Sequence, residues 1–301
     1  MTDTYDEFGL FRENADEFGI PWRGAPDVRR VAVPVGGDQT ISALLWGVGA
    51  PELVLVHGGA QNAHTWDTVA LALDRPLAAL DLPGHGHSSH RPDHVYWPAD
   101  NAVAVEQAVR ALAPDARVVV GMSLGGLTSI ALADHAPELV RNLVLVDVTP
   151  GVNREKSTAI ANFIDGPEYF ESFDEILERT VAFNPTRTES SLRRGVQHNA
   201  IELPDGRWRW RYDLPRRGTG EGESGSIMPG LEELWEAVSR VKVPLTLLRG
   251  SLSPVVDDDD VAELRRRNAD ARVVVVEGAG HSIQGDKPLQ LANLLAGLLS
   301  G

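Results

Sequence analysis

The chain has 301 residues, of which 43% are hydrophobic and 24% are charged, so it is long and apolar enough to bury a core. Its formal net charge is −15 and it has no cysteine. The acidic charge argues against nucleic acid or an anionic membrane surface as a partner. The missing thiol excludes disulfides, a thiolate nucleophile, iron–sulfur clusters and Cys-ligated zinc.

Residues 1–27 are predicted to form an acidic arm. The first twenty residues carry one basic residue, Arg12, against six acids: Asp3, Asp6, Glu7, Glu13, Asp16 and Glu17. A secretory signal would combine a basic start with an apolar stretch, so the cytoplasm is the expected compartment. Three phenylalanines of the arm, Phe8, Phe11 and Phe18, are expected to dock on an apolar surface.

Short apolar runs bounded by Gly, Pro or Asp are predicted to be strands. They span 28–33, 40–46, 53–56, 77–80, 118–120, 143–146, 245–248 and 273–276. Helical patterns occur at 65–73, 99–112, 124–135, 257–268 and 288–299. Most later runs are continuously apolar, as expected of parallel strands covered on both faces. The alternation predicts an α/β fold with a mostly parallel sheet of about eight strands and helices on both faces.

The alternation of strands and helices is interrupted between residues 150 and 235. This segment is predicted to be an inserted, mainly helical cap, which leaves 28–149 and 236–301 as the core. Within it, a Pro-Asp-Gly turn at 204–206 predicts a hairpin. The composition of 218–226, GTGEGESGS, is that of a flexible linker, either a surface loop or a hinge for the cap.

A serine lies between the strand at 118–120 and the helix at 124–135, in the sequence Gly-Met-Ser-Leu-Gly at 121–125. This is the context that a nucleophile elbow requires. The glycines let strand and helix approach closely, and the strained turn projects the serine oxygen above the strand ends. Ser123 is therefore the predicted nucleophile, and the N–H of Leu124 is a predicted oxyanion donor.

Two further strand ends carry candidates for the same chemistry. The strand at 53–56 runs into His57-Gly58-Gly59, and Gly59 is placed to give the second oxyanion N–H. His57 is better explained as a hydrogen-bonded support of this loop than as a base. The predicted base is His281, which follows a glycine-rich turn after the last strand and needs a carboxylate on its other ring nitrogen.

Five motifs follow one another in a familiar order. They are HGGAQNAHTW at 57–66, DLPGHGHSS at 81–89, GMSLGG at 121–126, LVLVD at 143–147 and GAGH at 278–281. In these motifs the sequence resembles the α/β-hydrolase superfamily, over about 28–148 and 236–301. The resemblance implies the α/β-hydrolase fold and a serine hydrolase with an inserted cap.

The sequence departs from that superfamily at the acid of the triad. Members usually carry it three residues beyond a glycine after the strand at 245–248, and here that position is Ser253. Some members place the acid at the end of the preceding strand, where this chain has Asp147, and we assign the acid there. The rival is the acidic run at 257–260, which is more simply explained as the N-terminal cap of a helix.

Neither a metal nor a cofactor is predicted. The histidines His85, His87, His90 and His94 lie on a Gly- and Pro-rich loop without a helical pair of ligands. Large apolar side chains near the expected junction of cap and core are predicted to contact substrate. These are Trp66, Met122, Trp97, Trp208 and Trp210.

These residues predict a serine hydrolase that cleaves a carboxylic ester or lactone of a small molecule; a serine nucleophile argues against epoxide hydrolase and haloalkane dehalogenase. One alternative is a carbon–carbon bond hydrolase for ring-cleavage products or diketones, since cap arginines could pair with a carboxylate. Those arginines are Arg187, Arg193, Arg194, Arg209 and Arg211, although a solvated face would explain most of them. A second alternative, favoured by Ser253, is a ligand-binding, weakly catalytic relative. Monomer and homodimer both remain open.

Overall fold

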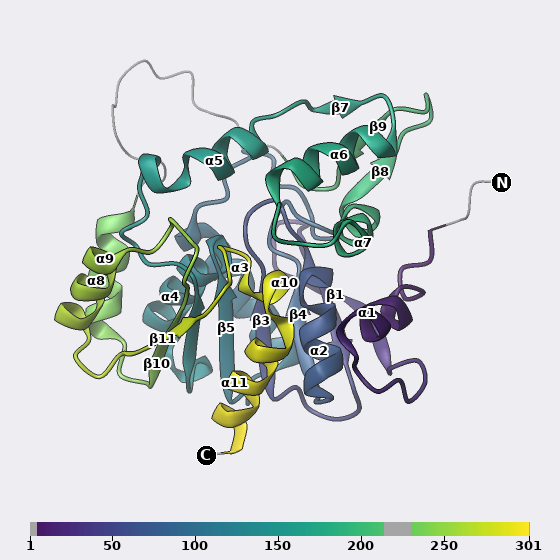
Figure 1. Cartoon of the computed structure of the whole chain (residues 1–301). Helices are drawn as coiled ribbons and strands as arrows, with labels where there is room; N and C mark the ends of the chain where they lie inside the picture. The colour runs from purple at the N-terminus through teal and green to yellow at the C-terminus, as the bar shows by residue number, and fades with distance from the viewer. Residues whose placement is uncertain (1–4, 214–229, 301) are drawn as a thin grey trace.

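The computed structural model describes residues 5–213 and 230–300, without the side chain of Arg154 (Figure 1). The predicted linker at 218–226 therefore lies outside the described residues. An eight-stranded sheet has the order β1-β2-β4-β3-β5-β6-β10-β11. Its strands are β1 (Val28–Pro34), β2 (Thr40–Trp46), β3 (Leu53–Val56), β4 (Leu77–Leu80), β5 (Val118–Met122), β6 (Leu143–Val146), β10 (Leu245–Gly250) and β11 (Arg272–Val276).

The sheet is mostly parallel. β2 pairs antiparallel with β1 and with β4, whereas every neighbouring pair from β4 to β11 is parallel. The predicted α/β-hydrolase fold is thereby confirmed. Because the carboxyl ends of parallel strands meet at one edge, the loops after β3, β5, β6, β10 and β11 gather there.

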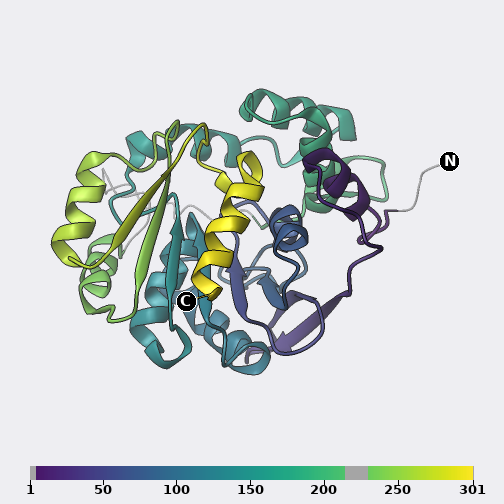
Figure 2. The same cartoon turned by 60° about the horizontal axis from the view of Figure 1, so that its bottom comes forward.

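Helices cover both faces of the sheet (Figure 2). One face carries α3 (Pro98–Leu112), α4 (Leu124–His135), α8 (Leu231–Arg240) and α9 (Asp258–Arg267). The other carries α1 (Phe11–Phe18), α2 (Asp67–Leu73) and α11 (Pro288–Ser300). In β3, Val54 and Val56 join the first core, and Leu53 and Leu55 join the second. Burial on both faces explains why this strand is apolar at every position.

The segment between β6 and α8 lies over the carboxyl edge of the sheet (Figure 1). It contains α5 (Arg154–Ile164), β7 (Tyr169–Phe170), α6 (Phe173–Phe183), α7 (Glu189–Asn199), β8 (Ala200–Glu202) and β9 (Trp208–Trp210). The three strands form a separate antiparallel sheet in the order β7-β9-β8. Helix α8 packs on α4 and buries Trp235 in the main core, so the boundary predicted at 235 falls inside a core helix.

The N-terminal arm is anchored by aromatic packing. The rings of Phe11 and Trp46 have centroids 4.8 Å apart, and Phe8 stacks on Phe11 at 6.0 Å. Helix α1 packs on α2, so the arm lies against the face of the sheet that α2 covers. The expected docking of the phenylalanines is thus found for Phe8 and Phe11, while Phe18 lines a cavity beneath the cap.

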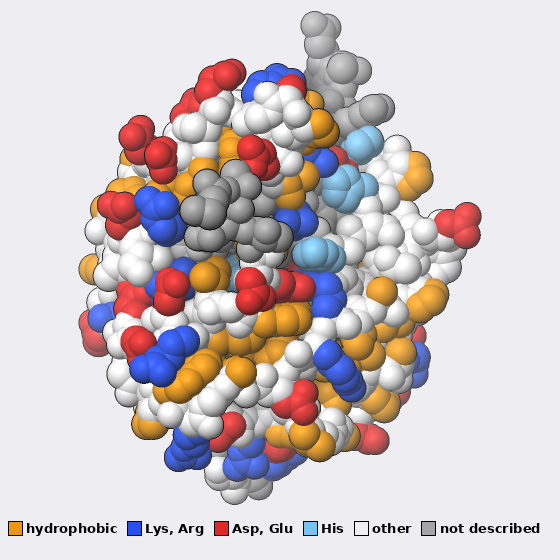
Figure 3. All heavy atoms as spheres, turned by 90° about the vertical axis from the view of Figure 1, so that its right-hand side faces the viewer, with side chains coloured by type: hydrophobic (Ala, Val, Ile, Leu, Met, Phe, Trp, Pro, Cys, Tyr) orange, Lys and Arg blue, Asp and Glu red, His pale blue; other side chains and the backbone are white. Residues whose placement is uncertain are grey.

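Acidic and basic side chains are interspersed on the face shown in Figure 3, and the histidines visible there gather on its upper half. No described helix is both long enough and apolar enough to cross a membrane.

Candidate active site

A cavity of about 470 Å³ separates the cap from the carboxyl edge of the sheet. The core lines it with loops that follow the strands, including Gly59, Ser123 and His281. The cap lines it with mainly apolar side chains from α5 and with both polar and apolar side chains from α6 and α7. Three of the residues predicted from separate motifs therefore face one space.

Ser123 occupies the strained turn that the motif predicts. Its backbone has φ 50° and ψ −120°, in a region that residues other than glycine rarely adopt. A Cβ on Gly121 would collide with the backbone of Gly125, and one on Gly125 would collide with the carbonyl of His57. The two glycines are thus required by the close packing of β5, α4 and the loop after β3.

The candidate oxyanion loop lies against this turn. A Cβ built on Gly58 would lie 3.1 Å from the Cβ of Ser123, so the loop passes directly over the nucleophile. A Cβ on the next residue, Gly59, would lie 3.9 Å from the side chain of Leu124. The residues that carry the two predicted donors, Gly59 and Leu124, are therefore neighbours on the cavity wall.

Two buried histidines support the oxyanion loop. His57 Nε2 accepts a hydrogen bond from the N–H of Leu82 (2.9 Å), so Nδ1 carries the proton and donates to the carbonyl of Gly58 (2.7 Å). His85 Nε2 accepts from the N–H of Ala60 (3.1 Å). Burial lowers the pKa of His57 and lowers that of His85 to about 3, so both rings are neutral. His57 is the structural support that its position predicts.

His281 is held by Asp147. His281 Nδ1 lies 2.8 Å from Oδ2 of Asp147, a fully buried carboxylate at the end of β6 with φ 51°. The other carboxylate oxygen, Oδ1, accepts the N–H of Gly250 (2.8 Å). A carboxylate on Nδ1 leaves Nε2 free to accept a proton, which is the tautomer that a general base needs.

Ser253, which occupies the usual position of the acid, is part of this arrangement. Its hydroxyl donates a hydrogen bond to Oδ2 of Asp147 at 2.5 Å. The position expected to carry the acid therefore holds a serine that binds the acid at the end of β6. The rival candidate for the acid, the acidic run at 257–260, caps a helix instead. Asp257 and Asp260 form a capping box at the start of α9, and both bind Lys156 of α5 at 2.8 and 2.7 Å.

The predicted substrate contacts divide into two groups. Trp97, Met122 and Trp210 line the cavity. Trp66 does not, because it ends the short helix η1 (Ala63–Trp66) with its side chain fully buried in the core beneath α2. Trp208 also lies away from the cavity lining and packs edge-on against Phe173 in the cap's own core, 5.3 Å between centroids. Trp210, two residues further along β9, lines the cavity and packs edge-on against Phe170, with 5.9 Å between ring centroids.

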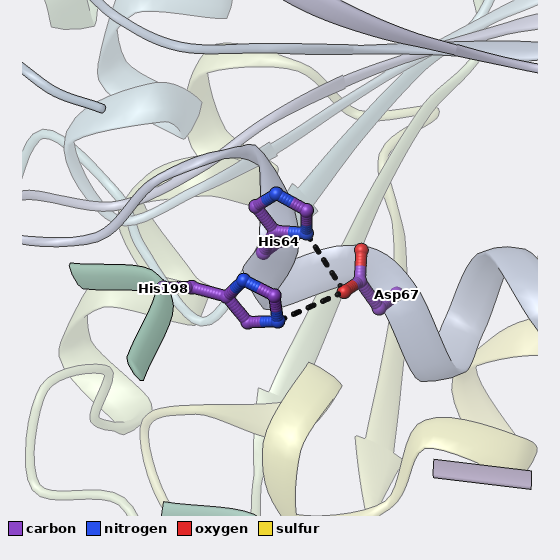
Figure 4. A group of neighbouring side chains, drawn as sticks. All are labelled: His64, Asp67 and His198. Carbon is purple, nitrogen blue, oxygen red and sulfur yellow. Dashed lines mark hydrogen bonds and ion pairs between the residues drawn. The ribbon is translucent and has the colours of Figure 1, made fainter. Parts of the chain in front are cut away.

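Sequence reasoning missed a polar cluster, formed by His64, Asp67 and His198, that joins cap and core (Figure 4). His64 Nδ1 lies 2.9 Å from Oδ2 of Asp67, and His198 Nε2 from α7 lies 3.7 Å from the same oxygen. Tyr5 of the arm hydrogen-bonds Nδ1 of His198 at 2.7 Å. The spacing of His64 and Asp67 was the local signal; the other contacts join distant parts of the chain.

The cluster offers two nitrogens and an oxygen within 4.8 Å of one another, which invites comparison with a metal site. The rings of His64 and His198 are parallel, however, with 5° between their planes and 3.8 Å between centroids. A metal lies in the plane of each imidazole that binds it, and parallel planes do not meet. One ring would have to turn before both could bind one ion. We therefore interpret the cluster as a polar contact that holds the cap on the core.

The cluster of His64, Asp67 and His198 predicts that the folded protein loses stability at alkaline pH. Burial opposes the charge of His64, but Asp67 and Glu7, on either side of the ring, raise its pKa from 6.5 to about 9. A raised pKa stabilises the fold fully below pH 6.5, and this contribution is lost as the pH rises through about 9. Arg30 and the neutral His198 face the same ring. Denaturant unfolding should show a loss on the order of 2 kcal/mol between pH 7 and 9.5.

The variant His64→Gln is the control for this prediction, because an amide keeps a hydrogen bond to Asp67 but does not titrate. Its stability should be lower at pH 7 and nearly constant up to pH 9.5. With no cysteine in the chain, thiol ionisation does not contribute to the curve. An equally steep decline in His64→Gln would contradict the assignment.

Comparison with known proteins points to one family. The profile of the alpha/beta hydrolase family matches residues 53–294. The chain is 45% identical to Esterase Rv0045c of Mycobacterium tuberculosis, over 98% of this chain and 96% of that one. A crystal structure of that esterase superposes with a TM-score of 0.86 and covers 100% of both chains. The chain is also 28% identical to the mouse sn-1-specific diacylglycerol lipase ABHD11, over 92% of this chain and 95% of the relative.

The extent of these matches decides the classification. The family profile spans both parts of the core and the cap between them, and the similarity to the mycobacterial esterase runs over nearly the whole chain. The protein is therefore a hydrolase of the alpha/beta hydrolase family.

Proposed function

We propose that this protein hydrolyses carboxylic esters or lactones through an acyl-enzyme formed on Ser123. The hydrogen bond between His281 and Asp147 carries the proposal, because it orients the imidazole on the cavity that Ser123 also lines. The mycobacterial relative, 45% identical and named an esterase, supports the same reaction.

In the first half of the reaction, the oxygen of Ser123 attacks the acyl carbonyl while Nε2 of His281 takes the hydroxyl proton. The carbonyl oxygen becomes an oxyanion, which the N–H groups of Gly59 and Leu124 stabilise. One such donor contributes about 3 kcal/mol in the transition state. The tetrahedral intermediate collapses, the carbon–oxygen bond to the alcohol breaks, and His281 returns the proton to the leaving oxygen.

Water completes the cycle by the same steps in reverse order. His281 takes a proton from water as its oxygen attacks the acyl carbon, and the bond to Ser123 breaks with return of the proton to the serine. Throughout, Asp147 stays ionised and stabilises the imidazolium, while Gly250 and Ser253 hold the carboxylate in place. Both donors act on Asp147 and neither contacts the reacting atoms.

The binding alternative loses the feature that favoured it. Ser253 suggested an incomplete triad, but its hydroxyl serves an acid that comes from β6 instead. The serine at the usual acid position is therefore compatible with full activity.

A fluorophosphonate probe and a substrate panel test this proposal on the wild-type protein. The probe should add one phosphonyl group, located by peptide mass spectrometry at Ser123. 4-Nitrophenyl acetate or a simple lactone should be turned over faster than a 1,3-diketone or a dienoate ketone. Absence of the adduct would reject the serine mechanism, and preferential cleavage of the ketones would replace ester hydrolysis with carbon–carbon bond hydrolysis.

A further inference from the structure

Arg187 brings a cation into the substrate cavity. It precedes the N-terminal cap of α7 and lines the cavity together with Ser123 and His281. The helix that follows His281, α10 (Ile283–Asp286), passes beneath its guanidinium: a Cβ on Gly285 would lie 2.9 Å from Cζ and 3.0 Å from Nε and Nη1. The absence of a side chain at Gly285 is what leaves room for the guanidinium.

The guanidinium of Arg187 has few hydrogen-bond partners and no counterion in the part of the chain that the structure describes. Within the described residues its hydrogen bond runs from Nη2 to Oγ of Ser191 (2.7 Å), and the buried Nε has no partner. Among the described residues, Asp286 and Glu17 act on its charge from a distance, and neither forms an ion pair with it. Burial lowers the pKa of Arg187, yet arginine stays charged in proteins. A largely buried charge without a counterion is costly, so a guanidinium on the cavity wall calls for an anion that the free chain lacks.

The two acids nearest to Arg187, Asp286 and Glu17, bind other groups. Asp286 accepts the N–H of Gly280 (2.7 Å) and the hydroxyl of Thr186 (3.2 Å), which fixes the turn before His281. Glu17 of the arm binds Arg194 and the hydroxyl of Thr188. Neither carboxylate can turn to Arg187 without breaking these contacts.

The neighbouring arginines of α7 show the contrast. Arg194 is more deeply buried, but Glu17, Asn14 and Ser190 bind its guanidinium. Arg193 is exposed and has only distant acids, at 3.8 and 4.0 Å. The expectation that the cap arginines lie on a solvated face therefore holds for Arg193 and is wrong for Arg187 and Arg194.

We propose that Arg187 binds a carboxylate on the acyl chain of the substrate, so that the preferred substrates are half-esters of dicarboxylic acids. This inference rests on the proposed function, since it names the substrate class of the same site. The planar guanidinium offers paired donors that match a carboxylate. Phe163, Ile164 and Phe183 line the same cavity and suit the methylene chain between the carboxylate and the ester.

Paired esters with one leaving group test the proposal. We would compare 4-nitrophenyl half-esters of adipic and suberic acid with 4-nitrophenyl hexanoate and octanoate, which match them in chain length and lack the carboxylate. Wild type should show kcat/KM about 10- to 100-fold higher for the half-esters, as expected of charged hydrogen bonds. Arg187→Met should abolish that preference, so that its kcat/KM values for the half-esters and for the neutral esters become similar.

Arg193→Met is the matched control, because it removes the same charge from the exposed side of α7 and should keep the preference. If the wild-type enzyme hydrolyses the neutral esters at least as well as the half-esters, the inference is overturned, whether or not Arg187→Met folds. A preference that survives in a folded Arg187→Met would also overturn it. Turnover that persists in Ser123→Ala would instead reject the proposed function, so the two failures are distinguishable.

Discussion

Replacing Ser123 with alanine is expected to lower kcat for 4-nitrophenyl acetate by about 10⁶-fold, the loss typical of removing the nucleophile of a serine triad. The oxyanion donors and the cavity stay in place, so a small rate above that in water should remain. The fold should not suffer, because alanine removes one oxygen from a half-buried side chain. Initial rates at enzyme concentrations up to the micromolar range, with the unfolding midpoint as a check, measure both effects.

Ser239 offers a control for this variant. It lies on α8, where its hydroxyl donates to the carbonyl of Trp235, and it does not line the cavity. Ser239→Ala should retain the wild-type rate and should not change labelling by a fluorophosphonate. A Ser123→Ala enzyme that keeps more than about a hundredth of the activity would show that another group is the nucleophile.

Features carried by short, local patterns could be predicted from the sequence. Strands β2, β3, β4 and β6 begin and end where their apolar runs do, since Gly, Pro and Asp bound buried strands sharply. The elbow around Ser123 and the turn before His281 are similarly local. Asp147 could be assigned because parallel strands bring their carboxyl ends to one edge, and β6 lies between β5 and β10.

Features that depend on side-chain direction or on distant contacts could not be predicted. Trp66 and Trp97 both precede helices, and only the packing of each turn decides that Trp66 enters the core while Trp97 lines the cavity. The partners of His198 come from the arm and from η1 and α2, more than a hundred residues away in sequence. Arg187 precedes α7 and lines the cavity, whereas Arg193 lies on the exposed side of that helix, and no periodic pattern in the sequence encodes this difference.

Replacing Asp147 with asparagine should lower kcat by about 10⁴-fold, the effect known for losing the triad carboxylate while its geometry is kept. Three donors converge on this carboxylate: the N–H of Gly250, the hydroxyl of Ser253 and Nδ1 of His281. An asparagine has one acceptor oxygen, so its amide N–H groups must face at least one donor. Asparagine tolerates the left-handed backbone at φ 51°, so the fold should persist.

A parallel variant tests the rival acid. Asp257→Asn removes the capping carboxylate of α9 and one partner of Lys156. It should cost less than about 1 kcal/mol of stability, because asparagine caps a helix as well as aspartate and the lost ion pair is half-exposed, and it should leave kcat within a few-fold of wild type. The opposite result, with a near-normal rate in Asp147→Asn and a large loss in Asp257→Asn, would move the acid to α9.

Ser253 allows the acid to be relocated. Its hydroxyl already lies 2.5 Å from the oxygen of Asp147 that binds His281, so a carboxylate at 253 can approach the same ring nitrogen from β10. In the double variant Asp147→Asn, Ser253→Asp, we expect at least tenfold recovery of kcat over Asp147→Asn alone. Ser253→Asp alone should impair the wild type, because two carboxylates would compete for one site and one would have to bind a proton. Recovery in the double variant together with impairment in the single variant would show that His281 needs one negative charge at this place, from either strand. No recovery in a folded double variant would mean that the direction from β6 matters as much as the charge.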